Sequence, residues 1–133
     1  MLEHNPDTVK IVLKNMPLNF HKFATPAALA ALAAHEQGKF WPFHDMLFAA
    51  ETLDQKAIDD TAVKLGLDLK RFNSDRNSKK VSQQVTQDLA DADTAGVTGT
   101  PTVFINGRLL PKRDMETIQS LIDQELAKLA GQK

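Results

Sequence analysis

Few side chains in this sequence belong to types that carry out chemistry. The histidines are spread along the chain and no two of them are three or four residues apart: His4, His21, His35 and His44. His35-Glu36 begins like the zinc-binding pattern H-E-x-x-H, but Gln37-Gly38 follows, and a glycine at that point ends a helix. We therefore expect no metal site and no cofactor.

The chain contains no cysteine. This excludes disulfides, thiolate metal sites and a cysteine nucleophile within these residues. A G-x-S-x-G elbow, a glycine-rich phosphate loop and a paired-carboxylate arrangement are also missing from the sequence. Asp54, Asp59 and Asp60 are explained by a helix cap and a solvated helix face. No catalytic residue is assigned.

The most informative stretch is GVTGTPTVFING, at residues 96–107. Thr100-Pro101 stands just before the apolar run 102–105, and Asn106-Gly107 is a strong signal for a hairpin turn. A trans Pro101 would merely begin an edge strand. A cis Pro101 would turn the backbone sharply and leave nearby N–H and C=O groups free to pair with an extended peptide.

The elements that would position this loop follow from periodicity and capping. Alternating apolar residues at 8–14 predict a β-strand with one buried face, formed by Val9, Ile11 and Leu13. Residues 102–105 and 108–110 are expected to form a hairpin. The predicted order is strand, several helices, hairpin and helix, and it favours a thin mixed sheet covered by helices on both sides.

Helices are expected after several capping residues: Thr25, Asp54, Asp68, Ser78 and Asp114. A further short helix, about residues 40–49, carries many aromatic side chains. Trp41 and its phenylalanine neighbours could line a ligand cleft, but core packing is the simpler interpretation.

Length and composition fit one globular domain over residues 1–133. The chain is 42% hydrophobic and has a net charge of −1, so it lacks the basic excess typical of nucleic-acid or anionic-membrane binding. No apolar run is long enough to span a bilayer, and the N-terminal sequence MLEHNPDTVK is not that of a signal peptide.

Several separated motifs give the sequence a family resemblance. NMPL at 15–18, EQGKFW at 36–41, HD at 44–45 and GVTGTPTVFING at 96–107 occur in the order seen in the DsbA-type branch of the thioredoxin superfamily. The sequence resembles these thiol-disulfide oxidoreductases from about residue 8 to residue 129.

The resemblance implies an α/β, truncated thioredoxin-like (DsbA-like) fold: a sheet of about three strands, with a helical insertion at about residues 22–95. The family's first strand and its C-x-x-C segment have no counterpart here. By position, Thr100 and Pro101 would form the cis-proline loop that holds substrate peptide. Since the thiolate is the nucleophile of disulfide exchange, we expect this chain to be redox-inactive.

Three functions follow from these observations. The first is a domain of the disulfide-exchange family, redox-inactive as this cysteine-free chain. The second is a non-enzymatic peptide-binding or chaperone-like module. The third is a relative of the glutathione-using isomerases and transferases. Family members are often periplasmic or exported, but no export signal is visible here, so the compartment stays open.

The resemblance also implies an association state. The absent strand would lie between residues 8–14 and 102–105, which leaves a gap of about 10 Å between unpaired backbone edges. Exposed apolar edges promote association, so we expect a homo-oligomer.

Overall fold

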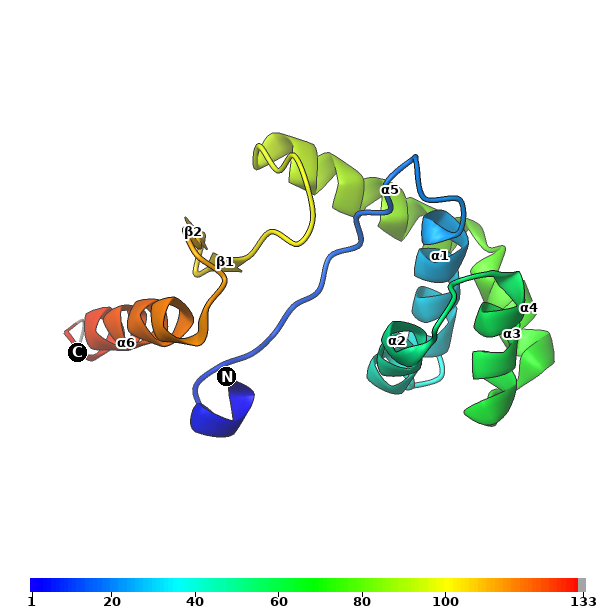
Figure 1. Ribbon diagram of the computed structural model, residues 1–133, viewed down its shortest axis with the longest axis horizontal. Helices are drawn as coiled ribbons and strands as arrows, with labels where there is room; N and C mark the ends of the chain where they lie inside the picture. The colour runs from blue at the N-terminus through cyan, green and yellow to red at the C-terminus, as the bar shows by residue number, and fades with distance from the viewer. Residues whose placement is uncertain (132–133) are drawn as a thin grey trace. The chain divides into compact units, whose positions relative to one another are not determined.

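The computed structural model describes residues 1–131. The chain divides into two compact units (Figure 1): a helical unit, Lys14–Gly96, and a loop unit, formed by Met1–Leu13 together with Val97–Lys133. The expected single domain over residues 1–133 stays a prediction.

The helical unit is built around its first helix. Its elements are α1 (Ala24–His35), α2 (Phe40–Ala49), α3 (Gln55–Lys64), α4 (Leu69–Arg76) and α5 (Lys79–Thr94). Helix α1 contacts each of the other four helices, as Figure 1 shows. Its alanine side chains are small enough to permit close approach on several sides, and four of them are buried: Ala30, Ala31, Ala33 and Ala34.

Large apolar side chains fill the space between these helices. Phe43 of α2 is fully buried, and its ring centroid lies 5.9 Å from that of Phe72 in α4. Ile58 of α3 is also fully buried. These residues and the alanines of α1 belong to one core cluster.

Polar contacts join the carboxyl end of α1 to α4. The Gln37 side chain donates to the backbone carbonyl of Asp68 at 3.1 Å and accepts from the backbone N–H of Asp68 at 2.9 Å. Lys80 of α5 pairs with Glu36 at 2.9 Å, and this hydrogen bond lowers the pKa of the Glu36 carboxyl. The region predicted as a helical insertion therefore has its own core and its own polar cross-links.

Three predicted helix caps of this unit are confirmed, and one is wrong. Asp54, Asp68 and Ser78 each accept a hydrogen bond from the backbone N–H three residues later. Thr25 does not cap α1, because the helix begins one residue earlier and Phe23 stands at its N-cap. Turns ending at Ala24 lead the chain into α1, so its first turn forms without a side-chain cap.

The aromatic residues of α2 are only partly in the core, contrary to expectation. Phe43 is buried, but Trp41 is 44% and Phe48 is 81% exposed. One side of a helix can face the core while the other faces solvent. Trp41 and Phe48 are two and five residues from Phe43, which places them on different sides of the helix from Phe43.

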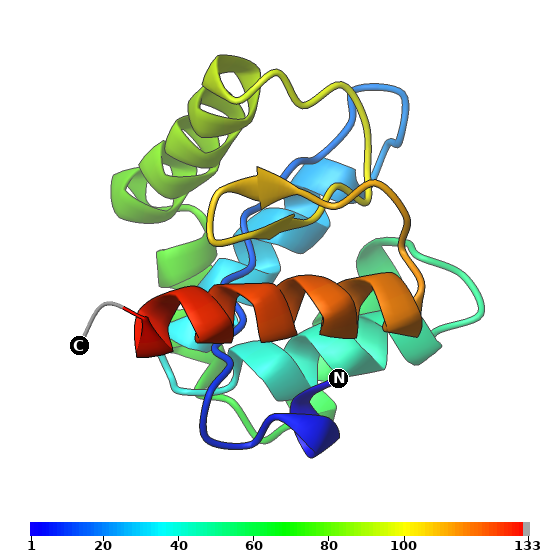
Figure 2. The same cartoon turned by 90° about the vertical axis from the view of Figure 1, so that its left-hand side faces the viewer.

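The loop unit contains a short 3₁₀ helix, η1 (Leu2–His4), strands β1 (Phe104–Ile105) and β2 (Arg108–Leu109), and helix α6 (Met115–Ala130). The two strands are antiparallel, with Phe104 opposite Leu109 and Ile105 opposite Arg108. Asn106 and Gly107 both have positive φ, 48° and 80°, as the predicted hairpin turn requires. Figure 2 shows this hairpin and α6.

The predicted strand at residues 8–14 does not form, and the expected sheet of about three strands has two. Ile11 and Leu13, expected on a buried face, are 42% and 38% exposed. The alternating pattern shows only which side chains would share a face if a strand formed. A strand also needs a neighbouring strand to which its backbone can hydrogen-bond. No such neighbour exists for this segment among residues 1–131.

Candidate functional site

The candidate site is the loop that precedes β1. Thr100, Pro101 and Thr102 are exposed, and the Thr100–Pro101 peptide bond is cis. The Thr102 hydroxyl donates to the backbone carbonyl of Gly99 at 2.6 Å, which closes the loop locally. The two residues singled out in the sequence, Thr100 and Pro101, thus stand side by side at the surface of the loop unit.

Arg113 is a second contributor to this loop. Its guanidinium Nη1 donates to the backbone carbonyl oxygen of Pro101 at 2.7 Å, across 12 residues of sequence. The next residue, Asp114, caps α6 by accepting from the backbone N–H of Thr117 at 2.7 Å. That hydrogen bond lowers the pKa of the Asp114 carboxyl, so the cap is anionic at neutral pH. The start of α6 therefore holds the backbone from which Arg113 reaches the loop.

Sequence reasoning missed Arg113. A single arginine in the segment between hairpin and helix looks like ordinary solvated surface. Its contact depends on the hairpin folding back, which brings residues 101 and 113 together. No local pattern could have found it.

The backbone of Thr100 is available for recognition. Within residues 1–131, neither its N–H nor its C=O is engaged by another main-chain group. An exposed backbone with free donors and acceptors can pair with an extended peptide by main-chain hydrogen bonding. Pro101 has no N–H to offer, so the free donor of the pair is that of Thr100.

The hairpin behind the loop is tied to α6. Arg108 of β2 donates to the carboxylate of Glu125 at 3.0 Å and to the side-chain carbonyl of Gln124 at 3.1 Å. The Arg108 hydrogen bond, together with that of Lys128, lowers the pKa of Glu125 below its ordinary value. The backbone N–H of Leu110 donates to the carbonyl of Val103 at 2.9 Å and extends the pairing toward the loop.

In the helical unit, aromatic rings line one side of α2. The His44 ring lies 4.5 Å from Phe48, 5.3 Å from Trp41 and 5.9 Å from Phe40, measured between centroids. His44 Nδ1 is 3.2 Å from a carboxylate oxygen of Asp45. This partly exposed row offers apolar and ring contacts, and among residues 1–131 no group of three potential metal ligands forms there.

A buried carboxylate organises the start of the helical unit. Asp88 of α5 is 3% exposed and accepts from the backbone N–H of Asn15 at 2.9 Å and from the Asn15 side chain at 3.2 Å. Gln84 donates to its other oxygen at 2.9 Å. Because all these partners are donors within the fold, Asp88 holds the chain at Asn15 in place and is not free for chemistry.

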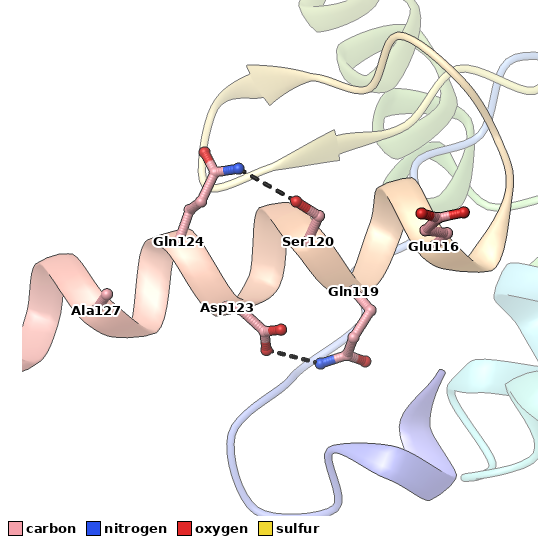
Figure 3. A pocket seen from close by; sticks show the side chains of 6 residues that line it. All are labelled: Glu116, Gln119, Ser120, Asp123, Gln124 and Ala127. Carbon is pink, nitrogen blue, oxygen red and sulfur yellow. Dashed lines mark hydrogen bonds between the residues drawn. The ribbon is translucent and has the colours of Figure 1, made fainter.

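A shallow hollow runs along one face of α6 (Figure 3), lined by Glu116, Gln119, Ser120, Asp123, Gln124 and Ala127. Its polar side chains pair along the helix: Gln119 donates to Asp123 at 2.9 Å and Gln124 to Ser120 at 3.3 Å. Gln119 also exchanges two hydrogen bonds with Asn5, at 2.8 and 3.0 Å, which attaches the N-terminal turn to α6. Donors and acceptors that satisfy one another in this way do not converge on a ligand.

In the part of the chain that is described, no three histidine, aspartate or glutamate side chains come together as metal ligands would. A helix long and apolar enough to cross a membrane is likewise not found within residues 1–131.

The chain's relationship to known proteins decides the family. The sequence profile of the family described as thioredoxin matches residues 3–124. The chain belongs to the thioredoxin family. The fold agrees: the chain is similar to the crystal structure of a thioredoxin-like oxidoreductase from Silicibacter pomeroyi, with a TM-score of 0.78 and 27% identity over 86% of this chain and 66% of that one.

Two relatives in sequence add detail. A probable disulfide bond formation protein D from Bacillus anthracis is 28% identical over 110 residues, which is 77% of this chain and 50% of the relative. A Na(+)/H(+) antiporter NhaA from Herminiimonas arsenicoxydans is 35% identical over 122 residues, 90% of this chain. The matched part is 19% of that antiporter, so the chain spans about a fifth of its length.

These findings place the chain among thioredoxin-superfamily proteins of the disulfide-oxidoreductase type. Its fold is thioredoxin-like, mostly helical with a small antiparallel sheet. These 133 residues contain no cysteine.

Proposed function

We propose that this chain is the substrate-holding part of a thiol-disulfide oxidoreductase domain and carries out no disulfide exchange by itself. The observation that carries the proposal is the free, exposed backbone of Thr100 beside Pro101, in a stretch of 133 residues that contains no cysteine. An extended polypeptide would pair with the main chain at Thr100.

The chemistry of disulfide exchange supports the proposal that this chain does not catalyse it alone. Disulfide exchange proceeds by attack of a thiolate on a sulfur atom through a mixed disulfide. A serine hydroxyl is not a substitute, because it is hardly ionised at neutral pH without an adjacent base. The cysteines of the reaction would therefore have to come from residues outside this sequence.

Arg113 would act in this function as a positioning residue. Its hydrogen bond to the carbonyl of Pro101 restrains the peptide plane between Pro101 and Thr102, one residue after Thr100. A fixed loop loses less conformational freedom when a peptide binds. The contact is charge-assisted, which makes it stronger than a hydrogen bond between neutral groups.

The antiporter name of one relative is no basis for ion transport by this chain, because the matched residues make up only 19% of that protein. The disulfide-formation name describes a relative of which half is matched. The proposal therefore concerns the domain and leaves the activity of a longer protein aside.

An insulin-reduction assay tests the proposal that this chain carries out no disulfide exchange by itself. With dithiothreitol as electron donor, this chain should precipitate insulin no faster than the donor alone. An acceleration that survives repurification would show that the sulfur is dispensable and would overturn the proposal.

A peptide-binding assay tests the proposal that the loop at Thr100 and Pro101 holds substrate. The probe is a fluorescein-labelled, S-alkylated insulin B chain, whose binding is followed by anisotropy. Arg113→Ala should weaken binding about fivefold, as expected for the loss of about 1 kcal/mol of positioning. Lys112→Ala removes the same charge one residue away and should leave binding unchanged. Equal effects of the two substitutions would indicate mere charge attraction and contradict the proposed role of the loop.

The absence of cysteine also favours a second candidate, a non-enzymatic peptide-binding or chaperone-like module. Suppression of the aggregation of an unfolded protein by this chain alone would support it. A glutathione-using isomerase or transferase is the third possibility. Binding of glutathione that competes with the labelled peptide would support that alternative.

A further inference from the structure

The turn of the β1–β2 hairpin contains the one Asn-Gly pair of the sequence, Asn106-Gly107. The other asparagines are followed by proline, methionine, phenylalanine or serine. In an Asn-Gly pair the backbone nitrogen of the glycine can attack the side-chain carbonyl carbon of the asparagine, because glycine has no Cβ to crowd that nitrogen. Asn106 is therefore the asparagine of this chain whose side chain can most readily react with the backbone that follows it.

Both residues of the turn are accessible for this reaction. Asn106 and Gly107 are exposed to solvent. Within residues 1–131, no main-chain carbonyl accepts from the N–H of Gly107. The N–H that must lose its proton in the attack is thus not occupied in the pairing of the two strands.

The folded turn restrains the attack, so the reaction depends on how easily the hairpin opens. Asn106 has a φ of 48°, as the hairpin turn requires, and ring closure needs the side chain to rotate toward the Gly107 nitrogen. A two-stranded hairpin is marginally stable alone. Phe104 and Leu109, which face one another across the strands, are 41% and 61% exposed. Apolar packing on this face therefore does little to keep the turn closed.

The attachment of β2 to α6 is the stronger restraint, and Asn106 takes part in it. Arg108 donates to the carboxylate of Glu125 at 3.0 Å and to Gln124 at 3.1 Å. The hydrogen bond from Arg108 is the largest cause of the lowered pKa of Glu125, and the side-chain amide of Asn106 adds a smaller one. The reactive amide thus faces the same carboxylate that holds the hairpin to α6.

We propose that Asn106-Gly107 is a site of spontaneous modification, at which Asn106 converts to aspartate or isoaspartate and thereby loosens the hairpin from α6. The Gly107 nitrogen loses its proton to solvent and bonds to the side-chain carbonyl carbon of Asn106. That carbon releases its amide nitrogen as ammonia, which leaves a five-membered cyclic imide. Water then opens the imide at either carbonyl. The net reaction consumes one water and releases one ammonia, and no oxidant or reductant takes part.

Each product weakens the attachment for its own reason. Aspartate at position 106 removes a donor from Glu125 and places a second carboxylate near it, and like charges close together repel. Isoaspartate routes the main chain through the former side-chain carbon, so a two-residue turn no longer closes the pairing of Ile105 with Arg108. The inference concerns the hairpin and holds whether or not Thr100 holds peptide.

Peptide mapping by mass spectrometry, after incubation of the whole chain in mildly alkaline buffer, measures the modification. Conversion at Asn106 should be at least about tenfold faster than at Asn19, which is also exposed but is followed by the bulky Phe20. Fragmentation that separates aspartate from isoaspartate identifies the products. Amide exchange of residues 104–109 should be faster in the incubated chain than in the fresh chain, while exchange in α1 stays the same.

Arg108→Ala tests the dependence on the attachment to α6. It should speed conversion at Asn106 at least about threefold, because the turn opens more often when the hairpin is released. Lys112→Ala removes a cation from the same unit but not from the hairpin, and should leave the rate unchanged. Asn106→Gly lacks the reactive amide but keeps a turn sequence that tolerates positive φ. Amide exchange of its hairpin should therefore not change on incubation.

Three results would overturn the inference. They are conversion at Asn106 no faster than at Asn19, a conversion rate that Arg108→Ala leaves unchanged, and incubation that speeds exchange of residues 104–109 equally in the Asn106→Gly variant. Peptide binding at Thr100 is measured on freshly prepared chain, so failure of one proposal is distinguishable from failure of the other.

Discussion

The helical unit and the loop unit differ in how completely they bury their apolar side chains. The main core cluster lies in the helical unit, around the alanines of α1 and the rings of Phe43 and Phe72. In the loop unit the buried apolar side chains are fewer: Leu110, Leu121 and Ile122. Phe104, Leu109 and Val12 of the same unit are exposed.

The difference follows from how each type of element satisfies its backbone. A helix pairs its own main-chain groups, so a set of short helices needs only a shared apolar surface. A strand depends on a neighbour that can be far away in sequence or in another chain. The main chain of the helical unit is therefore paired within its own helices, while the unit that carries the candidate site has strand edges without partners.

The largest expected effect tests the core of the helical unit. Phe43→Ala should lower the free energy of unfolding of this unit by about 3–5 kcal/mol, because it empties a fully buried ring site against Phe72. Urea unfolding followed by circular dichroism measures the change. Phe48→Ala, on the exposed side of the same helix, should stay within about 0.5 kcal/mol. Similar losses for both variants would contradict the assignment of α2's buried face.

The next effect concerns the buried carboxylate that holds Asn15. Asp88→Ala leaves the backbone N–H of Asn15 without its acceptor and should cost about 1–3 kcal/mol. Asp91→Ala removes the exposed contacts of that carboxylate with Lys14 and Gln87 and should cost clearly less. Urea denaturation of the two variants ranks them. The reverse order would show that the surface pair, and not Asp88, fixes the chain there.

The smallest effect lies in the loop unit and depends on pH. The Arg108 hydrogen bond keeps the pKa of Glu125 below its ordinary value of 4.5 in the folded chain. The stabilisation is therefore complete above the unfolded pKa and is lost as pH falls through the lower folded value. Arg108→Ala should flatten this acid-side loss, as measured by amide exchange of residues 104–109 between pH 6 and pH 3. An unchanged slope would mean that the pair does not hold the hairpin to α6.

The sequence predicted the helices well because their determinants are local. Asp54, Asp68, Ser78 and Asp114 cap the helices that follow them, and Asn106-Gly107 makes the hairpin turn. Family membership, and with it the thioredoxin-like fold, was also predictable from the motifs around residues 15–18, 36–45 and 96–107.

The remaining features depend on contacts that a local pattern does not contain. Apolar and polar residues alternate at 8–14 as they do in a strand, but no described strand pairs with this segment. Arg113 reaches Pro101 only after the hairpin folds, and Asp88 receives Asn15 from 73 residues away. Trp41 and Phe48 are aromatic but exposed, because residue type alone does not say which side of a helix faces the core.

Amide hydrogen exchange can show whether the helical unit has a fully paired backbone while the unit carrying Thr100 and Pro101 has open edges. We expect slow exchange in α1, at Ala30–Ala34, and much faster exchange at residues 9–13 and 104–109 of the isolated chain. Equal protection of the two sets in the monomeric chain would contradict it, because the open edges would then already be paired.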